Sequence, residues 1–309
     1  MNAVTKTEKT KPKDLFPIFL MAGLFVLVDL SSLLLVTPFE TAGVTAFMNP
    51  NDPLNLVYFF ASLIITTAII LLLAKFWKRS VEVIILGAVG YMVFFVFSIL
   101  LSFVVSGIVA LGLSIFAAAA IIILLVKFPE WYVVDASGIL IGLGSIALLG
   151  ISLSIFLVII LLIGMAIYDA ISVRGTKHMV TLADVVLELK LPVMLIIPKI
   201  RGYSLLKDKK SLKEKLKEGE EREAFAIGTG DIVMPGILVA STFSSISTNG
   251  FLIAFSVMLG TLLGFSILAI FLLRGKPQPG LPYLCSGAIL GYIVSSYLLF
   301  GGLIGLTIP

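Results

Sequence analysis

Nine long apolar runs constrain this chain more than any other feature. Each has roughly 20 residues or more, enough to cross the hydrocarbon core of a bilayer. The runs cover residues 15–37, 54–74, 81–105, 107–126, 131–149, 152–173, 224–247, 250–273 and 280–306. Only Ser106-Gly107 separates the third run from the fourth, and only Gly150 separates the fifth from the sixth. Since each joined pair approaches about 40 residues, too long for one crossing, the pattern predicts an all-α, polytopic membrane protein with nine transmembrane helices.

Composition excludes several other classes of protein. Apolar residues make up 59% of the chain and charged residues only 13%, about half the charged share of a soluble domain. A single cysteine, Cys285, and a single histidine, His178, exclude a disulfide framework and any zinc or haem site with several such ligands. No metal or other cofactor is therefore expected. The net charge of +4 gives no reason to expect nucleic acid as a partner, and the predicted surroundings are bilayer lipids.

The positions of the basic residues support the count of nine. In a nine-span topology all 22 Lys and Arg residues fall on one side of the membrane. They occur before residue 15, at 75–79, at 127, between 174 and 222, and at 274–276. Because Lys and Arg collect in cytoplasmic loops, this segregation predicts a multi-pass protein whose amino terminus is cytoplasmic.

The chain divides at its one long connection between spans. We expect an amino-terminal membrane half of six spans (1–173), a cytoplasmic connection (174–223) and a carboxy-terminal half of three spans (224–309). Within the connection, the charged residues of Met179–Ile197 interrupt an apolar segment and predict an interfacial amphipathic helix. Residues 207–223 are rich in Lys and Glu and predict a solvated linker.

Four aspartates lie within predicted spans, where an ionisable group is a functional candidate by default: Asp29, Asp135, Asp169 and Asp231. Asp135 follows two aromatic residues typical of the membrane interface, which favours a structural role near water. Asp29 lies deep in the first span and is followed by two serines, which favours a buried hydrogen-bonding or packing role.

Asp169 and Asp231 differ from the other two because they lie at similar depths in consecutive antiparallel spans. Two carboxyls held close together cannot both ionise easily, and such a pair tends to share one proton. The ionised partner can then take a proton from water while the protonated partner donates to a carbonyl oxygen. This pattern predicts metal-free hydrolysis of a peptide bond within the membrane.

Small and helix-breaking residues surround these positions. Gly228 and Gly230 precede Asp231 and allow another backbone to approach closely, although ordinary glycine-mediated helix packing would look the same. The ninth run begins with Pro279-Gly280-Leu281-Pro282, which cannot be regular helix throughout. Irregular backbone at the membrane edge is tolerated where it is buried or lines a cavity, and a stiff interhelical turn is the alternative.

Together these elements resemble the GxGD-type intramembrane aspartyl proteases of the presenilin and signal peptide peptidase superfamily. The family signature has Tyr-Asp in the sixth span, Gly-x-Gly-Asp in the seventh and Pro-Ala-Leu at the ninth. The matching segments here are Tyr168-Asp169, Gly228-Thr229-Gly230-Asp231 and Pro279-Gly280-Leu281. Gly280 departs from the pattern, which has alanine. The size and short loops are most similar to archaeal presenilin-like homologues, which implies an archaeal cell membrane.

The resemblance implies specific roles. Asp169 and Asp231 would be the catalytic pair of an aspartic endopeptidase. Pro279, Gly280 and Leu281 would shape the site and hold substrate, with Gly228 and Gly230 beside them, while Tyr168 would line the site. The substrates would be transmembrane helices or signal peptides, and the presenilin-like orientation favours type I substrates. A second copy of the chain remains a candidate partner.

The principal alternative is a proton-coupled transporter or channel, in which intramembrane aspartates would relay protons. Other intramembrane proteases need residues that this chain lacks in its spans. A serine–histidine enzyme requires a histidine there, but His178 lies in the connection. A zinc protease requires two histidines in His-Glu-x-x-His.

Overall fold

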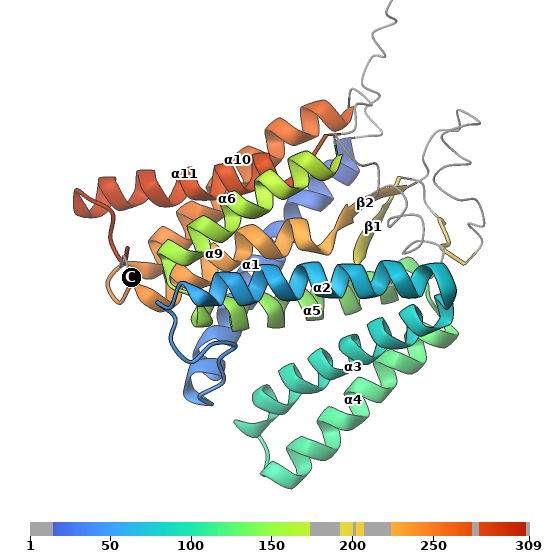
Figure 1. Ribbon diagram of the computed structural model, residues 1–309. Helices are drawn as coiled ribbons and strands as arrows, with labels where there is room; N and C mark the ends of the chain where they lie inside the picture. Colours follow the sequence, from blue (N-terminus) through green and yellow to red (C-terminus); the bar gives the residue numbers. More distant parts are fainter. Residues whose placement is uncertain (1–14, 174–191, 200–201, 207–223, 274–277, 307–309) are drawn as a thin grey trace, which may run out of the picture.

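The computed structural model describes residues 15–173, 192–199, 202–206, 224–273 and 278–306, in which nine helices and two strands are found. The helices are α1 (Leu15–Thr41), α2 (Leu54–Phe76), α3 (Lys78–Ser102), α4 (Gly107–Lys127), α5 (Trp131–Ser152), α6 (Ile155–Ile171), α9 (Thr229–Ser245), α10 (Gly250–Leu273) and α11 (Leu281–Phe300). They form one bundle (Figure 1), which confirms the predicted all-α membrane architecture.

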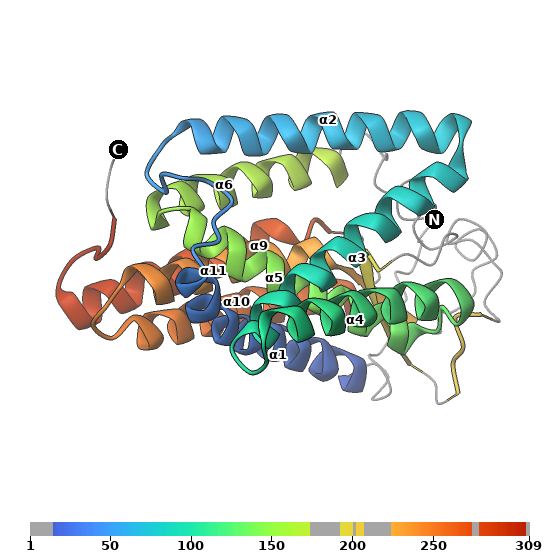
Figure 2. The ribbon, with the colours of Figure 1, turned by 90° about the horizontal axis from the view of Figure 1, so that it is seen from below.

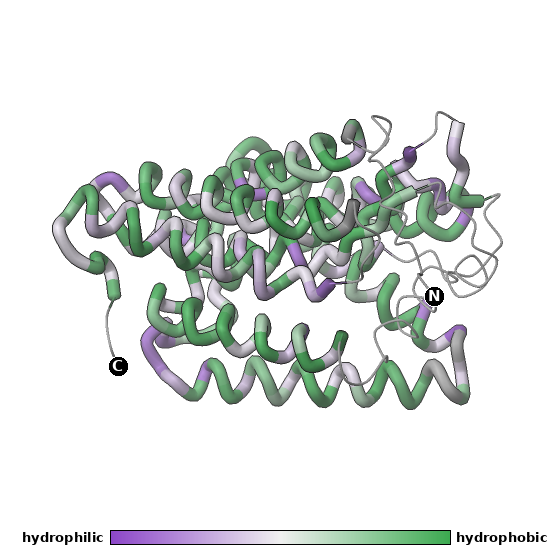
Figure 3. The backbone as a smooth tube through the Cα atoms, turned by 90° about the horizontal axis from the view of Figure 1, so that it is seen from above, coloured by the Kyte–Doolittle hydropathy of each residue, from purple (hydrophilic) through white to green (hydrophobic). Residues whose placement is uncertain are grey.

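The helices differ in length in a way that bears on the site. Seven of the nine described helices are long and apolar enough to span a bilayer. The other two, α6 and α9, have 17 residues each, or about 25 Å of helix. Figure 3 shows that the helix bodies are largely hydrophobic and that many of the hydrophilic residues gather near the ends of the bundle. The two short helices are the ones that carry Asp169 and Asp231.

Several predicted span boundaries differ from the helices of the structure, among them the following three. Residues Ala224–Gly228 form strand β2, so α9 begins at Thr229 and its first turn contains Asp231. Gly150 does not end the fifth span, because α5 continues to Ser152 and Gly150 packs against Ala240 of α9. The ninth span ends at Phe300, where Gly301 adopts the left-handed conformation (φ 71°) that favours glycine at a helix end.

A two-stranded antiparallel sheet lies at one end of the bundle, next to the start of α9 (Figure 1). Strand β1 (Met194–Pro198) pairs with β2, with Met194 opposite Gly228. The amphipathic helix predicted over Met179–Ile197 is therefore wrong at its carboxyl end, because a short apolar run beside a proline forms a strand instead. Residues 179–191 of that segment and the linker 207–223 lie outside the described residues.

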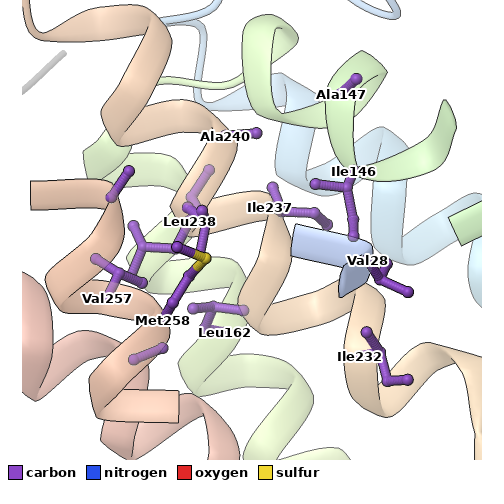
Figure 4. Close-up of a cluster of buried hydrophobic side chains, with 14 of the residues drawn as sticks. Val28, Ile146, Ala147, Leu162, Ile232, Ile237, Leu238, Ala240, Val257 and Met258 are labelled. Atoms are coloured by element: carbon purple, nitrogen blue, oxygen red, sulfur yellow. The ribbon is translucent and has the colours of Figure 1, made fainter. Parts of the chain in front are cut away.

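Helix α9 lies at the centre of the packing, in contact with α1, α5, α6, α10 and α11. Its residues from Pro235 to Thr242 are all buried. Figure 4 shows Ile237 and Leu238 among buried side chains of the neighbouring helices, including Val28, Ile146, Leu162 and Met258. Ser241 and Thr242 are completely buried and hydrogen-bond to backbone carbonyls, so these two hydroxyls of α9 face protein.

Helix α2 lies at the edge of the bundle (Figure 2), and no residue in its most apolar window is buried. Its first half packs against α6, where the Phe60 ring lies 2.7 Å from the position that a Cβ on Gly164 would occupy. Its second half exposes large apolar side chains, among them Ile65, Leu72 and Phe76. In a bilayer, this apolar surface faces lipid at no cost in hydration.

Helices α10 and α11 approach each other most closely at glycines. A Cβ on Gly264 would collide with the carbonyl oxygen of Tyr283, and one on Gly287 would collide with that of Gly260. Because the atoms in the way belong to the backbone, no side-chain rotation relieves the contact. Small residues that bring two backbones together are a main source of helix association in membranes.

We therefore expect Gly287→Ala to destabilise the protein by about 1–3 kcal/mol, the typical penalty for overpacking. Thermal unfolding in detergent measures this effect as a lower midpoint. Gly112→Ala in α4 is the matched control, because a Cβ there meets nothing within 4 Å. Equal midpoints for the two variants would contradict the close packing of α10 and α11.

Candidate active site

Asp169 lies in the last turn of α6 and is only 2% exposed. A carboxyl there faces the negative end of the helix dipole and needs hydrogen-bond donors from elsewhere. The backbone N–H of Leu281 donates to Oδ2 of Asp169 at 3.0 Å, and the backbone of Gly280 also hydrogen-bonds to this carboxyl. The first turn of α11 thus supplies the donors, because its N–H groups have no partner within their own helix.

Asp231 occupies the third position of α9, just after strand β2 ends. Gly228 is the N-cap residue, in an extended conformation (φ −64°, ψ 136°). The Asp231 carboxyl reaches back to hydrogen-bond the backbone of Gly228, as an acidic residue does in a capping box. The positive end of the helix dipole also favours a carboxylate there. Unlike Asp169, Asp231 is partly exposed.

The segment before α11 joins the two carboxyls. Residues 278–280 are not helical, which confirms the irregular backbone predicted before the ninth span. Leu281 donates to Asp169, while a Cβ on Gly280 would lie 3.3 Å from Oδ2 of Asp231. Both carboxyls therefore contact the same dipeptide, and they interact electrostatically with each other. Three elements far apart in the sequence (α6, the start of α9 and the start of α11) meet here.

The remaining predicted site residues lie at different distances from the pair. A Cβ on Gly228 would be 3.6 Å from Oδ2 of Asp231, and Pro279 is buried next to Gly280. Gly230 is exposed, with no atom within 4 Å of the position of an added Cβ. Tyr168 is 44% exposed. The structure thus brings Gly228, Gly280 and Leu281 to the carboxyls, while Tyr168 and Gly230 face outward.

The other two buried aspartates lie apart from this pair. Asp29 is 1% exposed, and its Oδ1 lies 2.7 Å from the position of a Cβ on Gly236 of α9. Asp135 accepts a hydrogen bond from the backbone of Ile196 in β1 at 2.7 Å. Within the described ranges, no group of three or more His, Cys, Asp or Glu side chains could hold a metal ion.

Sequence reasoning missed the sheet that leads into Asp231. A signal for it was present, because the short apolar run Met194–Pro198 is preceded by Pro192, and prolines are unfavourable inside a helix. The length of the run, five residues, is also typical of a strand.

This geometry defines a class of protein: a multi-pass membrane protein with two carboxyls on consecutive spans beside irregular backbone. Comparison with known proteins shows the family. Residues 22–302 match the family model described as signal-peptide peptidase, presenilin aspartyl protease. The chain therefore belongs to this family of intramembrane aspartyl proteases and is a hydrolase. No curated protein matches the chain.

Solved structures agree with this assignment. The chain is similar to a presenilin family intramembrane aspartate protease crystallised in space group C222, at 31% identity and a TM-score of 0.68. That match covers 91% of this chain and 99% of the other. A presenilin family intramembrane aspartate protease in space group P2 is 32% identical with a TM-score of 0.65, covering 90% of this chain and 96% of the other.

The contact between Gly280 and Asp231 predicts how much bulk the site tolerates. Gly280 has φ −80° and ψ −47°, which any residue can adopt. A single methyl group requires the Asp231 carboxyl to move by only a few tenths of an ångström. We expect Gly280→Ala to cleave a transmembrane peptide within about threefold of the native rate, and Gly280→Val to lose about tenfold or more. Gly23→Ala, with open space around the added Cβ, is the control, and a native rate in Gly280→Val would contradict the contact.

Proposed function

We propose that Asp169 and Asp231 are the catalytic pair with which this intramembrane protease hydrolyses peptide bonds. The observation that carries the proposal is that both carboxyls contact the dipeptide Gly280-Leu281. The two groups therefore lie beside the same short segment of chain. A structural role for each aspartate alone, such as capping a helix, does not require them to meet.

In the proposed reaction the pair starts with one shared proton. The ionised carboxyl takes a proton from water as the water oxygen attacks the scissile carbonyl carbon, and the protonated carboxyl donates its proton to the carbonyl oxygen. In the second step the C–N bond breaks as one diol hydroxyl gives its proton to the ionised carboxyl and C=O forms, while the protonated carboxyl donates its proton to the leaving nitrogen, so the pair again holds one proton. Because the two groups titrate as a unit, neither proton is assigned to one residue.

The two carboxyls differ in burial and in hydrogen bonding. Hydrogen bonds from the start of α11 hold Asp169, which is buried, in one orientation. Asp231 is partly exposed, which supports water and substrate reaching the pair from its side. The mechanism needs both properties, because a reacting carboxyl must be held in place and water must still reach the scissile bond.

Strand β2 offers a binding site for an unwound substrate. The backbone N–H of Thr229 donates to the carbonyl oxygen of Val193 at 3.0 Å. Hydrogen-bonded and non-hydrogen-bonded residue pairs alternate along an antiparallel sheet, so every second residue pair counted from this one is hydrogen-bonded. Ala226, opposite Ile196, therefore directs its N–H and C=O away from β1. Ala226 is exposed, and no other described strand pairs with this edge. A helical substrate has no accessible peptide bond, and an added strand would present one close to Asp231.

We also propose that this end of the bundle is cytoplasmic. Every connection that carries Lys or Arg emerges on the same side in a nine-span topology, and β1 is itself part of the long basic connection. The chain would then present its site near the cytoplasmic face of an archaeal cell membrane. Transmembrane segments and signal peptides are the proposed substrates, with type I orientation favoured.

Asp169→Asn and Asp231→Asn test the catalytic pair, because each keeps the shape of the side chain but cannot complete the proton transfers. We expect cleavage of a labelled transmembrane peptide by detergent-purified protein to fall by about 100-fold or more in each variant. Asp29→Asn is the matched control and keeps its activity, because it changes a buried aspartate that packs against Gly236 rather than beside Gly280 and Leu281. Undiminished cleavage in either site variant would contradict the proposal, and proton-dependent flux through reconstituted protein would then become the measurement to make.

Ala226→Pro tests strand addition. Proline removes the outward N–H of Ala226 but none of the bonds between β1 and β2, and it is tolerated at a strand edge. We expect KM to rise by about tenfold with a smaller change in kcat, because one backbone hydrogen bond to substrate is lost while the carboxyls stay in place. Ala226→Val, which keeps the N–H, is the control. Unchanged kinetics in Ala226→Pro would mean that substrate binds elsewhere.

A further inference from the structure

The first half of α5 contacts the segment that leads to Asp231 at three points. The first of these is Asp135, which is 8% exposed and accepts a hydrogen bond at Oδ1 from the backbone N–H of Ile196 at 2.7 Å. Ile196 is itself 3% exposed, and its N–H points away from β2. Without Asp135 this donor would be buried and unpaired, a state that backbone groups rarely tolerate.

Gly138, almost one turn further along α5, provides the second contact. A Cβ on Gly138 would lie 3.0 Å from Cδ2 of Leu195 and 3.3 Å from the carbonyl oxygen of Pro192. It would also lie 3.7 Å from Cγ2 of Thr229. The missing side chain therefore lets β1 and the first residue of α9 lie directly on the helix.

Glu130, the N-cap residue of α5, provides the third contact. Its Oε1 accepts a hydrogen bond from the Ser204 hydroxyl at 2.6 Å, and its Oε2 accepts one from the backbone of Leu205 at 3.1 Å. Glu130 thus holds the chain beyond β1, while Asp135 and Gly138 hold β1 itself. We refer to Glu130, Asp135 and Gly138 together as the α5 platform.

The path from the platform to the catalytic pair is short. Strand β1 pairs with β2 in one register, and Val193 accepts the backbone N–H of Thr229 at 3.0 Å. Asp231 follows Thr229 by two residues. A displacement of β1 therefore moves the N-terminus of α9, whereas Asp169 is held separately by the start of α11. The distance between the two carboxyls thus depends on where β1 lies.

We infer that Asp135 is a positioning residue for intramembrane proteolysis: by holding β1 on the α5 platform, its carboxyl sets the place of Asp231 relative to Asp169. This inference rests on the proposed catalytic pair. Asp135 touches neither substrate nor the reacting atoms and acts only through the strand. What it must supply is a hydrogen-bond acceptor of the right shape, and a negative charge is not needed for that.

Asp135→Asn and Asp135→Ala separate these requirements, because asparagine keeps an acceptor oxygen and alanine does not. Each variant is first titrated with a transition-state analogue, so that rates refer to folded enzyme. We expect Asp135→Ala to lower kcat by about tenfold with KM within about twofold, and Asp135→Asn to remain within about threefold of native. A role in stability alone would reduce the amount of folded enzyme and leave kcat unchanged.

Gly138→Ala tests the same contact without removing a polar group, and alanine favours the helical state of α5. Its methyl group pushes on Pro192 and Leu195, and we expect kcat to fall by about tenfold. Gly142→Ala, one turn further along α5, is the matched control. A Cβ there makes only ordinary contacts, 3.6 Å to Val233 and 3.7 Å to Val28, so native kcat is expected.

Amide hydrogen exchange provides a readout that does not depend on cleavage. Peptides covering 194–198 and 224–231 should exchange about tenfold faster in Asp135→Ala and Gly138→Ala than in the native chain, Asp135→Asn and Gly142→Ala. Failure of the catalytic pair would appear separately, as full activity in Asp231→Asn. The positioning role is overturned by native kcat or native exchange in Asp135→Ala. It is also overturned by equal loss of kcat in the Asn and Ala variants, which would make the charge of Asp135 the essential property.

Discussion

The structure depends on one constraint, the need to satisfy backbone N–H groups that are removed from water. At three places in the described residues a carboxylate from another element accepts such a bond. Asp169 accepts from the first residue of α11, Asp135 from the middle of β1 and Glu130 from the chain beyond it. Each such bond satisfies a buried or partly buried donor, which would cost about 1–3 kcal/mol if left unpaired, and it also ties a remote element to the bundle.

The same constraint explains how a hydrolytic site can exist in a bundle of apolar helices. Irregular backbone before α11 exposes donors that hold one carboxyl, and the change from β2 to α9 places the second carboxyl in a helix's first turn. Helices α6 and α9 are short, so both aspartates lie near helix ends. Because residues 228 and 280 are glycines, the space beside the Asp231 carboxyl is free of their side chains. Reactivity and solubility in lipid are therefore compatible because the two carboxyls of the proposed pair lie at these helix ends.

Much of the architecture could be predicted because only long apolar segments are stable across a bilayer and basic loops stay on its cytoplasmic side. The nine-helix fold and its family follow from that pattern and from the motifs at Asp169, Asp231 and Pro279. The boundaries were less predictable. A glycine between two apolar runs predicts a break between two helices at Gly150. Gly150 lies inside α5 instead, because a glycine also permits close helix packing, here against Ala240. Likewise Ala224–Gly228 looks like the start of a span, and only its pairing with β1 makes it a strand.

By itself the sequence predicted the nine helices found in the described residues and singled out Asp169 and Asp231 as the proposed pair, because length and hydropathy decide what a bilayer accepts and an acidic residue within an apolar run stands out. Only the tertiary structure decided what those residues touch. Leu281 meets Asp169 across 112 positions of sequence, and Ile196 meets Asp135 across 61. Such contacts arise from the packing of whole helices and strands, and no local pattern encodes which backbone donor a buried carboxylate will find.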